Sequence, residues 1–339
     1  MAEGGGSHHC SISSRYSRIL PQGRQARVTR GVPIGSPKGV PVPTPELRSN
    51  STNAAFSASV FSSTVFSTTV FSATVFSDTV ASLRAAGCVF AEDEAHLLLD
   101  SAADPAELLG FLERRVAGYP LEHIIGWAEF GGLRVAVDSG VFVPRRRTEL
   151  VVDEAAALLR GNPGGRRPLA HVVVDLCCGS GAVGAALARR VGGIELHAAD
   201  IDPIAVKCAR RNVGEAGGQV YEGDLYEPLP PRLLGKVGLL AVNAPYVPTE
   251  AISMMPHEAR EHESRIALDG GADGLTFHRR IAAGAPGWLA PGGYLLIETS
   301  ERQAEGTASI MAAAGFSIRI VHSEELDGTV VIGLRAQAT

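Results

Sequence analysis

The chain has 339 residues, of which 45% are apolar, 20% charged and 6% aromatic, and its formal net charge is −5 at pH 7. This composition is typical of a globular protein with one large and one small domain. The sequence contains neither an uncharged apolar run of membrane-spanning length nor a secretory signal, so we expect no membrane association. The five cysteines show no paired spacing, which predicts free thiols in a cytoplasmic protein and no metal site.

The first 80 residues differ in character from the remainder. Residues 1–55 are rich in Gly, Ser, Pro and Arg, and residues 56–80 are five pentads beginning Phe-Ser. A period of five residues suits neither a helix nor a strand, so we expect residues 1–80 to be a disordered low-complexity extension. Two alternatives are an organellar transit segment and upstream sequence that precedes a translation start near Val80. The other residues are net acidic, which disfavours non-specific DNA binding.

A small helical domain is predicted for residues 81–120. Apolar positions recur at helical spacing within residues 92–118 and are interrupted at Asp104-Pro105, which indicates two short helices. We expect this domain to dock the substrate.

Residues 121–145 are predicted to form a β-hairpin linker, extended from His123 and turning at Gly131-Gly132. Thr148 then lies where an N-cap would precede a helix over residues 149–160.

The catalytic domain is predicted to span residues 146–339. Strand and helix patterns alternate there, which indicates a doubly wound α/β fold with a parallel sheet. The predicted strands are 171–176, 195–200, 219–222, 237–242, 293–298, 316–322 and 329–334, and the predicted helices are 181–191, 203–213, 274–289 and 301–314. Because only a short turn at Asp327-Gly328 separates the last two strands, we expect an antiparallel edge.

A glycine-rich turn follows the first of these strands. It consists of Cys177, Cys178, Gly179, Ser180 and Gly181. Glycines let a backbone approach a ligand closely, and the following helix offers free N–H groups at its start. The turn lacks the Gly-Lys-Ser/Thr ending of a P-loop, although an ordinary strand–helix turn would look similar.

Acidic residues end the next two strands. Asp200 lies where a carboxylate can accept hydrogen bonds from ribose hydroxyls, a spacing that a nicotinamide dehydrogenase would share. Asp202 is better placed to cap the next helix, with Pro203 in its first turn. At the third strand end, Asp224 could hold an adenine amino group and Leu225 could cover the ring, although a surface turn fits equally well.

The segment Asn243, Ala244, Pro245 and Tyr246 follows the fourth strand. The Asn243 side-chain oxygen and the Ala244 carbonyl can both accept hydrogen bonds from one NH2 group. Such a grip positions a weakly nucleophilic nitrogen and stabilises the positive charge that develops on it during methyl transfer. Tyr246 can stack on a planar amide or base. We therefore expect these four residues to be catalytic, although a packed strand-end turn would also fit.

With these motifs in place, residues 82–339 resemble the HemK-type protein-(glutamine-N5) methyltransferases. The resemblance extends beyond the glycine turn to several blocks: Ile125-Gly126 with Glu129-Phe130-Gly131, Phe142–Arg145 with Thr148–Leu150, Gly223–Leu229, Arg265–Leu275 and Leu295–Glu298.

The resemblance implies a seven-stranded Rossmann-like methyltransferase sheet with an antiparallel last strand. It implies S-adenosylmethionine as cofactor, bound by Cys177, Cys178, Gly179, Ser180, Gly181, Asp200, Asp224, Leu225 and Asn243. The implied acceptor is a glutamine amide in the Gly-Gly-Gln loop of a class 1 peptide-chain release factor, although relatives modify a ribosomal protein. We also expect a monomer that binds neither DNA nor a membrane.

Three departures from the family pattern bear on the substrate. Ala244 replaces the usual first proline of Asn-Pro-Pro-Tyr, Cys177-Cys178 replace small or polar residues, and only residues 82–118 precede the hairpin where the family has a longer helical domain. Three alternatives therefore stay open: an adenine-N6 nucleic-acid methyltransferase, a small-molecule N-methyltransferase, and a cofactor-binding protein without activity.

Overall fold

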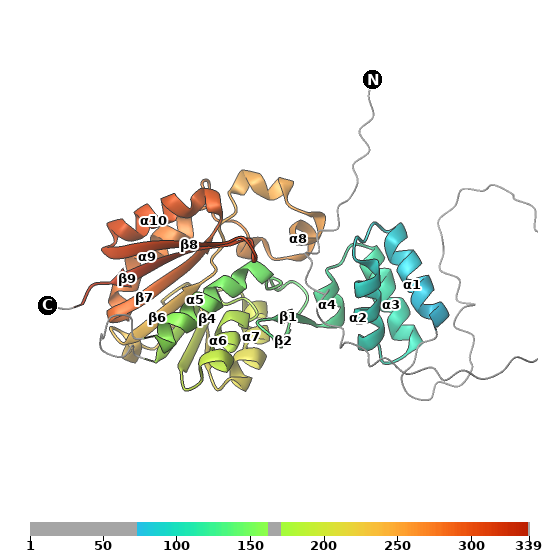
Figure 1. The fold of residues 1–339 in the computed structure, drawn as a ribbon, viewed down its shortest axis with the longest axis horizontal. Coiled ribbons are helices and arrows are strands. Elements are labelled where there is room, and N and C mark those ends of the chain that lie inside the picture. Colours follow the sequence, from blue (N-terminus) through green and yellow to red (C-terminus); the bar gives the residue numbers. More distant parts are fainter. Residues whose placement is uncertain (1–72, 162–170, 338–339) are drawn as a thin grey trace, which may run out of the picture.

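The computed structural model describes residues 73–161 and 171–337, which form a helical N-terminal part and an α/β domain (Figure 1). A two-stranded hairpin connects them. The α-helices are α1 Ala73–Ala85, α2 Ala91–Ser101, α3 Pro105–Val116, α4 Leu121–Ile125, α5 Glu149–Arg160, α6 Ala182–Val191, α7 Pro203–Glu215, α8 His257–His262, α9 Thr276–Trp288 and α10 Ala304–Ala313. Short 3-10 helices are η2 Arg146–Thr148, η3 Pro231–Leu233, η4 Thr249–Met254, η5 Arg265–Ala267 and η6 Glu301–Gln303.

A seven-stranded sheet forms the centre of the α/β domain. Its strands are β3 Val172–Leu176, β4 Glu195–Asp200, β5 Gln219–Glu222, β6 Val237–Val242, β7 Leu289–Thr299, β8 Phe316–Ser323 and β9 Gly328–Arg335. Their order is β5-β4-β3-β6-β7-β9-β8, and the first five run parallel. β9 is antiparallel to both β7 and β8. The doubly wound fold with an antiparallel last strand is therefore confirmed, but that strand lies inside the sheet and β8 forms the edge.

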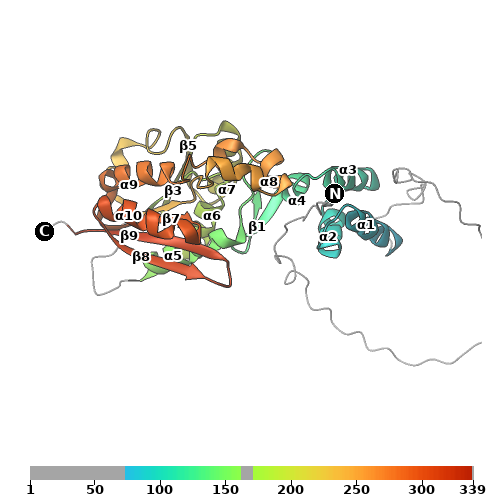
Figure 2. The ribbon, with the colours of Figure 1, turned by 90° about the horizontal axis from the view of Figure 1, so that it is seen from above.

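Helices cover both faces of this sheet (Figure 2). On one face α5, α6 and α7 pack on side chains such as Val173, Leu239 and Leu296. On the other face α9 and α10 pack on alternate residues of the same strands, among them Val174 and Leu240. Because both faces are buried, the strands are almost continuously apolar, as parallel strands usually are.

The N-terminal part is larger than we predicted. Helix α1 begins at Ala73, inside the pentad repeats, and buries Thr79, Val80 and Leu83 against α2 and α3. The expected disordered extension is therefore wrong for residues 73–80, and a start near Val80 would remove half of α1. Residues 1–72 lie outside the described part. The predicted break between α2 and α3 is confirmed, with Asp104 capping α3 by accepting a hydrogen bond from the Glu107 N–H at 2.9 Å.

The linker contains a short helix that we did not predict. Residues 121–125 form α4, where we expected extended chain from His123, and Gly126 ends the helix in a left-handed conformation. The predicted hairpin is confirmed as β1 Trp127–Phe130 and β2 Leu133–Ala136, joined by Gly131 and Gly132. The predicted helix over 149–160 is confirmed as α5, but the Thr148 hydroxyl does not cap it.

Buried charges join the two parts of the molecule. Arg115 of α3 is 2% exposed and donates hydrogen bonds to Glu94 of α2 and to Glu258 of α8, each at 2.6 Å. Tyr119 stacks on His262 of α8 with ring centroids 4.2 Å apart. Helix α8 therefore lies between the N-terminal helices and the sheet (Figures 1 and 2). Within residues 73–161 and 171–337, no helix is long and apolar enough to cross a membrane.

Candidate active site

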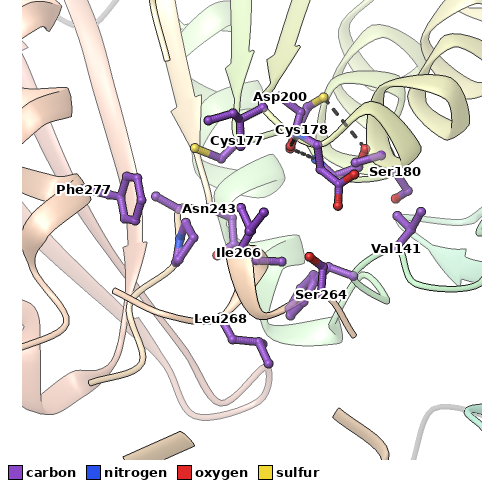
Figure 3. Close-up of a pocket in the computed structure, with 18 of the residues that line it drawn as sticks. Val141, Cys177, Cys178, Ser180, Asp200, Asn243, Ser264, Ile266, Leu268 and Phe277 are labelled. Carbon is purple, nitrogen blue, oxygen red and sulfur yellow. Dashed lines mark hydrogen bonds between the residues drawn. The ribbon is translucent and has the colours of Figure 1, made fainter. Parts of the chain in front are cut away.

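A cavity lies at the carboxyl ends of β3, β4, β5 and β6, where open parallel sheets bind ligands. Figure 3 shows Asp200 and Cys178 on one side of it, Ser264 and Leu268 on the other, and Ile266 between them. The predicted site residues that line this cavity are Cys177, Cys178, Gly179, Ser180, Asp200, Asp224, Leu225, Asn243, Ala244, Pro245 and Tyr246. The structure thus brings together segments that are separated by up to about 70 residues of sequence.

The glycine-rich turn presents backbone to the cavity. Cys177 and Gly179 both have φ of +54°, a left-handed conformation that favours glycine. A Cβ built on Gly179 would meet no protein atom within 4 Å, so the backbone is open for a ligand to approach. Burial raises the pKa of the Cys177 and Cys178 thiols well above the ordinary value, so both stay protonated at neutral pH.

Gly181 differs from the rest of the turn. It is absent from the cavity lining, and a Cβ built on it would lie 2.6 Å from Cγ2 of Val213 in α7. Its φ of +77° is also in the left-handed region. This glycine therefore lets α6 start close to α7, and its assignment to cofactor binding stays a prediction.

Asp200 is oriented by the backbone around it. Its Oδ2 accepts a hydrogen bond from the Gly179 N–H at 2.8 Å, and its Oδ1 accepts one from the Asp202 N–H at 2.9 Å. Burial raises its pKa, and these N–H groups oppose the rise. Asp202 caps α7 through the Ile204 N–H at 2.9 Å, as predicted. Asp200 is therefore a fixed hydrogen-bond acceptor at the cavity wall.

Asp224 already has one protein partner. Its Oδ2 accepts a hydrogen bond from Arg280 of α9 at 2.7 Å, a contact that the sequence did not indicate. Leu225 has φ of +50° and is 8% exposed, with its side chain in the cavity wall. A carboxylate and an apolar side chain therefore lie side by side at the end of β5.

Residues 243–246 form the opposite part of the wall. The Asn243 amide donates from Nδ2 to the Thr148 hydroxyl at 3.3 Å, which directs its Oδ1 away from Thr148. The Tyr246 hydroxyl donates to Oε1 of Glu298 at 3.3 Å. Burial, followed by the charge of Glu298, raises the pKa of Tyr246, so this hydroxyl remains a donor. Both side chains are thus anchored by residues far away in sequence.

The backbone of this turn is held from outside by the segment 268–274. The Val247 N–H donates to the Leu268 carbonyl at 3.1 Å, and the Gly270 N–H donates to the Val247 carbonyl at 2.8 Å. A Cβ on Gly270 would lie 2.8 Å from the Pro245 oxygen, so only glycine fits there. Gln303 adds a hydrogen bond from Nε2 to the Tyr246 carbonyl at 2.9 Å.

The wall facing the glycine turn is apolar and comes from residues around α8. Met255, Ile266 and Leu268 line the cavity there, together with Phe142 from the segment after the hairpin. Met254 and Ile266 are 80% and 57% exposed. Helix α8, beside this apolar mouth, is joined to the N-terminal helices by the ion pair between Glu258 and Arg115.

Several residues of the site were not predicted from sequence. Thr148 and Arg147 line the cavity, and Glu298 lies buried behind Tyr246. Thr148 and Glu298 were marked only by membership of the blocks on which the family resemblance rested, and Arg147 lies outside those blocks. Arg280 carried no signal, because its partner Asp224 lies 56 residues away.

Comparisons with known proteins bear on this arrangement. The family described as "Methyltransferase small domain" matches residues 132–258. The release factor glutamine methyltransferase of Geobacter sulfurreducens is 38% identical over 222 residues, which cover 64% of this chain and 74% of that protein. The release factor glutamine methyltransferase of Moorella thermoacetica is 37% identical over 208 residues, which cover 60% of this chain and 70% of that protein.

A relative with a different substrate is similar to nearly the same extent. The 4-amino-L-phenylalanine/4-methylamino-L-phenylalanine methyltransferase of Streptomyces pristinaespiralis is 34% identical over 233 residues, covering 69% of this chain and 78% of that protein. The chain is therefore similar both to proteins named for a glutamine acceptor and to one named for an aromatic amine.

Proposed function

Because the chain belongs to the HemK-type protein-(glutamine-N5) methyltransferase family, we propose that it methylates a glutamine side-chain amide in the Gly-Gly-Gln loop of a peptide-chain release factor. The chain is an S-adenosylmethionine-dependent methyltransferase. The observation that best supports this acceptor is the position of the Asn243 carboxamide, whose Nδ2 is hydrogen-bonded to Thr148 at the cavity wall.

The residues of the cavity fit this cofactor. The open backbone at Gly179 gives room for close approach, and the fixed Asp200 carboxylate can accept hydrogen bonds from the ribose hydroxyls. Asp224 and Leu225 can hold the adenine edge and cover its face. The carboxylates also favour the positive charge of a sulfonium compound, because opposite charges attract strongly in a partly dehydrated site.

The acceptor side grips a planar NH2 group. The Asn243 Oδ1 and the Ala244 carbonyl each accept a hydrogen bond from one of its two N–H groups. This fixes the amide plane, so that the nitrogen lone pair, which is perpendicular to that plane, is directed toward the cofactor. Replacement of the family's proline by Ala244 keeps this carbonyl, and the packing of Gly270 and Gln303 supports the turn. The Tyr246 ring can stack on the planar amide, and its hydroxyl is hydrogen-bonded to Glu298.

The reaction is a direct displacement. When bound, S-adenosylmethionine supplies a methyl group whose bond to sulfur breaks with its electron pair on sulfur, while the lone pair of the acceptor nitrogen forms the new bond. The methylated nitrogen then releases one proton to water. The oxygens of Asn243 and Ala244 stabilise the positive charge on the N–H groups before that proton leaves.

The similarity to the aromatic-amine enzyme of Streptomyces pristinaespiralis supports a second candidate, N-methylation of a small aromatic amine. The same grip would hold an aniline NH2, and Tyr246 would stack on its ring. The helical N-terminal part favours the protein acceptor, because α3 is joined through Arg115 to α8, which lies beside the cavity mouth.

We further propose that the enzyme acts as a monomer in the cytoplasm and does not methylate DNA. The free thiols of Cys88, Cys177, Cys178 and Cys208 support a reducing compartment. The net acidity of the chain after residue 80 disfavours a DNA substrate, because DNA binding requires a surface that neutralises phosphates.

A labelling survey tests the acceptor. The purified full chain is incubated with radiolabelled S-adenosylmethionine and, separately, with release factor, ribosomes, DNA and 4-amino-L-phenylalanine. We expect label on the release factor, and none on a release factor whose Gly-Gly-Gln glutamine is replaced by alanine. Label on DNA alone or on the aromatic amine alone would refute the proposed acceptor.

A further inference from the structure

Three side chains form a series behind the acceptor turn. Asn243 follows β6, Glu298 lies in β7, and Thr148 ends η2 just before α5. Because β6 and β7 are paired with Val242 opposite Ile297, the next residues of the two strands are neighbours. Asn243 donates to the Thr148 hydroxyl at 3.3 Å, and the Thr148 side chain lies beside the Glu298 carboxyl group, where it lowers the pKa of that group.

The chemistry of these groups gives the series a direction. A carboxylate only accepts hydrogen bonds, whereas a hydroxyl has one proton to donate and lone pairs to accept. Thr148 accepts the hydrogen bond of the Asn243 amide through a lone pair, which leaves its own proton for the neighbouring Glu298 carboxyl group. Only the NH2 end of that amide can donate a hydrogen bond to this lone pair, so the carbonyl oxygen points away from Thr148. The two ends of a carboxamide are nearly equivalent in shape, so a hydrogen-bond partner is needed to fix which end points toward the cavity.

Glu298 is held as an acceptor by its surroundings. It is 1% exposed, it receives the Tyr246 hydroxyl at 3.3 Å, and Nε of Arg147 lies 3.5 Å from its Oε1. Thr148 is 2% exposed, so water cannot readily replace it as the partner of Asn243. Burial raises the pKa of Glu298, and Thr148 and Arg147 oppose the rise.

We propose that Thr148 and Glu298 are positioning residues, which fix the Asn243 carboxamide with its oxygen toward the acceptor nitrogen. The inference rests on the proposed function, in which that oxygen grips an NH2 group. A flipped carboxamide would present its own NH2 to the acceptor, and two donors facing each other repel. The series therefore determines which end of Asn243 meets the substrate, although neither Thr148 nor Glu298 needs to react.

The test uses the full chain and four variants. Thr148→Val removes the hydroxyl and keeps the branched shape, Thr148→Ser retains the hydroxyl, and Glu298→Gln replaces one acceptor oxygen by a donor. Thr307→Val is the matched control, because Thr307 is fully buried and hydrogen-bonded to His278 at 2.9 Å but does not line the cavity. Cofactor affinity, kcat and KM for release factor are measured for each.

We expect Thr148→Val and Glu298→Gln to lower kcat by about tenfold to a hundredfold, since misplacement of a gripping group costs that much, with the affinity for S-adenosylhomocysteine nearly unchanged. Thr148→Ser should restore kcat to within about threefold of the parent, because the hydroxyl is back in place. Thr307→Val should leave kcat unchanged. Equal kcat in Thr148→Val and the parent, or equal losses in Thr148→Val and Thr148→Ser, would overturn the proposal.

A second readout does not depend on the acceptor. The side-chain NH2 signals of ¹⁵N-labelled asparagine are recorded with S-adenosylhomocysteine bound, and Asn243→Ala identifies the Asn243 pair. We expect slow exchange of one of its protons with solvent in the parent and in Thr307→Val, and faster exchange in Thr148→Val. Unchanged exchange in Thr148→Val would overturn the positioning role. If the parent fails to methylate release factor while this exchange pattern holds, the proposed function fails and the positioning role stands.

Discussion

The two sides of the cavity are built in different ways. On the cofactor side, Asp200 is held by N–H groups 21 and 2 residues away, within the unit formed by β3, α6 and β4 and the turn that follows it. On the acceptor side, Asn243 and Tyr246 are held by side chains 95 and 52 residues away. The cofactor side therefore depends on local backbone geometry, which many methyltransferases can share. The acceptor side depends on tertiary contacts, and we propose that it selects the substrate.

The largest expected effect separates the two sides most clearly. Asn243→Ala should lower kcat by about 100- to 1,000-fold, the usual loss when one donor or acceptor at the reacting atom is removed. Calorimetry with S-adenosylhomocysteine should find the affinity nearly unchanged. A large loss of affinity for S-adenosylhomocysteine would show that Asn243 also binds the cofactor, as the family resemblance implies. The cofactor side and the acceptor side would then share this residue.

The reciprocal change is Asp200→Ala on the cofactor side. Removing a carboxylate that accepts ligand hydrogen bonds should weaken S-adenosylhomocysteine binding by about tenfold to a hundredfold. At saturating cofactor, kcat should fall much less than in Asn243→Ala. The division fails if Asp200→Ala leaves the dissociation constant unchanged in calorimetry.

Within the cofactor side, the two glycines of the turn should behave differently. Gly181→Ala should reduce the free energy of unfolding by about 1–3 kcal/mol, because its methyl group would overlap Val213. Gly179→Ala should lose less stability, because its methyl group would meet no protein atom within 4 Å. It should lose more cofactor affinity, because the methyl group would occupy space that the cofactor approaches. Urea unfolding and calorimetry of both variants check this, and the reverse ranking would contradict the assignment of Gly181 to packing.

A further comparison concerns Asp175, the residue before the last one of β3, which accepts a hydrogen bond from the Gly184 N–H at 2.8 Å. Burial raises its pKa to about 8 from an ordinary value of 3.8. Between these values the folded protein binds one proton more than the unfolded chain, so stability falls as pH rises through this window. Asp175→Asn stays neutral and should lose less stability between about pH 5 and about pH 8 in urea unfolding.

The exposed Asp153 of α5 provides the control for that measurement. Asp153→Asn should keep the pH dependence of the parent, because it leaves the buried carboxyl in place. If Asp175→Asn has the same pH dependence as the parent, the buried carboxyl does not titrate in this range.

The contrast between the two sides also explains what could be predicted from sequence. The strands, the Gly131-Gly132 hairpin and the Asp202 cap depend on neighbouring residues, and the structure confirms them. Helix α4 was missed because a five-residue segment is too short to show a helical period. The insertion of β9 between β7 and β8 depends on pairing that no local pattern encodes.

The contacts of the acceptor side could not be predicted for the same reason. The partnership of Thr148 with Asn243 requires the fold to bring η2 beside the end of β6. Thr148 was instead assigned to capping α5, a role that its local position suggested and its hydroxyl does not perform. Similarly, Gly181 has the spacing of a ligand-binding glycine, but its role became evident only from the position of Val213.

The central claim is that the acceptor grip serves a glutamine amide of a protein. The most direct measurement is mass spectrometry of a release factor after incubation with the full chain and S-adenosylmethionine, with fragmentation to locate the added methyl group. The account predicts one methyl group on the side-chain nitrogen of the Gly-Gly-Gln glutamine, which is absent when the enzyme carries Asn243→Ala. An unmodified glutamine, under conditions where the enzyme methylates 4-amino-L-phenylalanine or DNA, would contradict it.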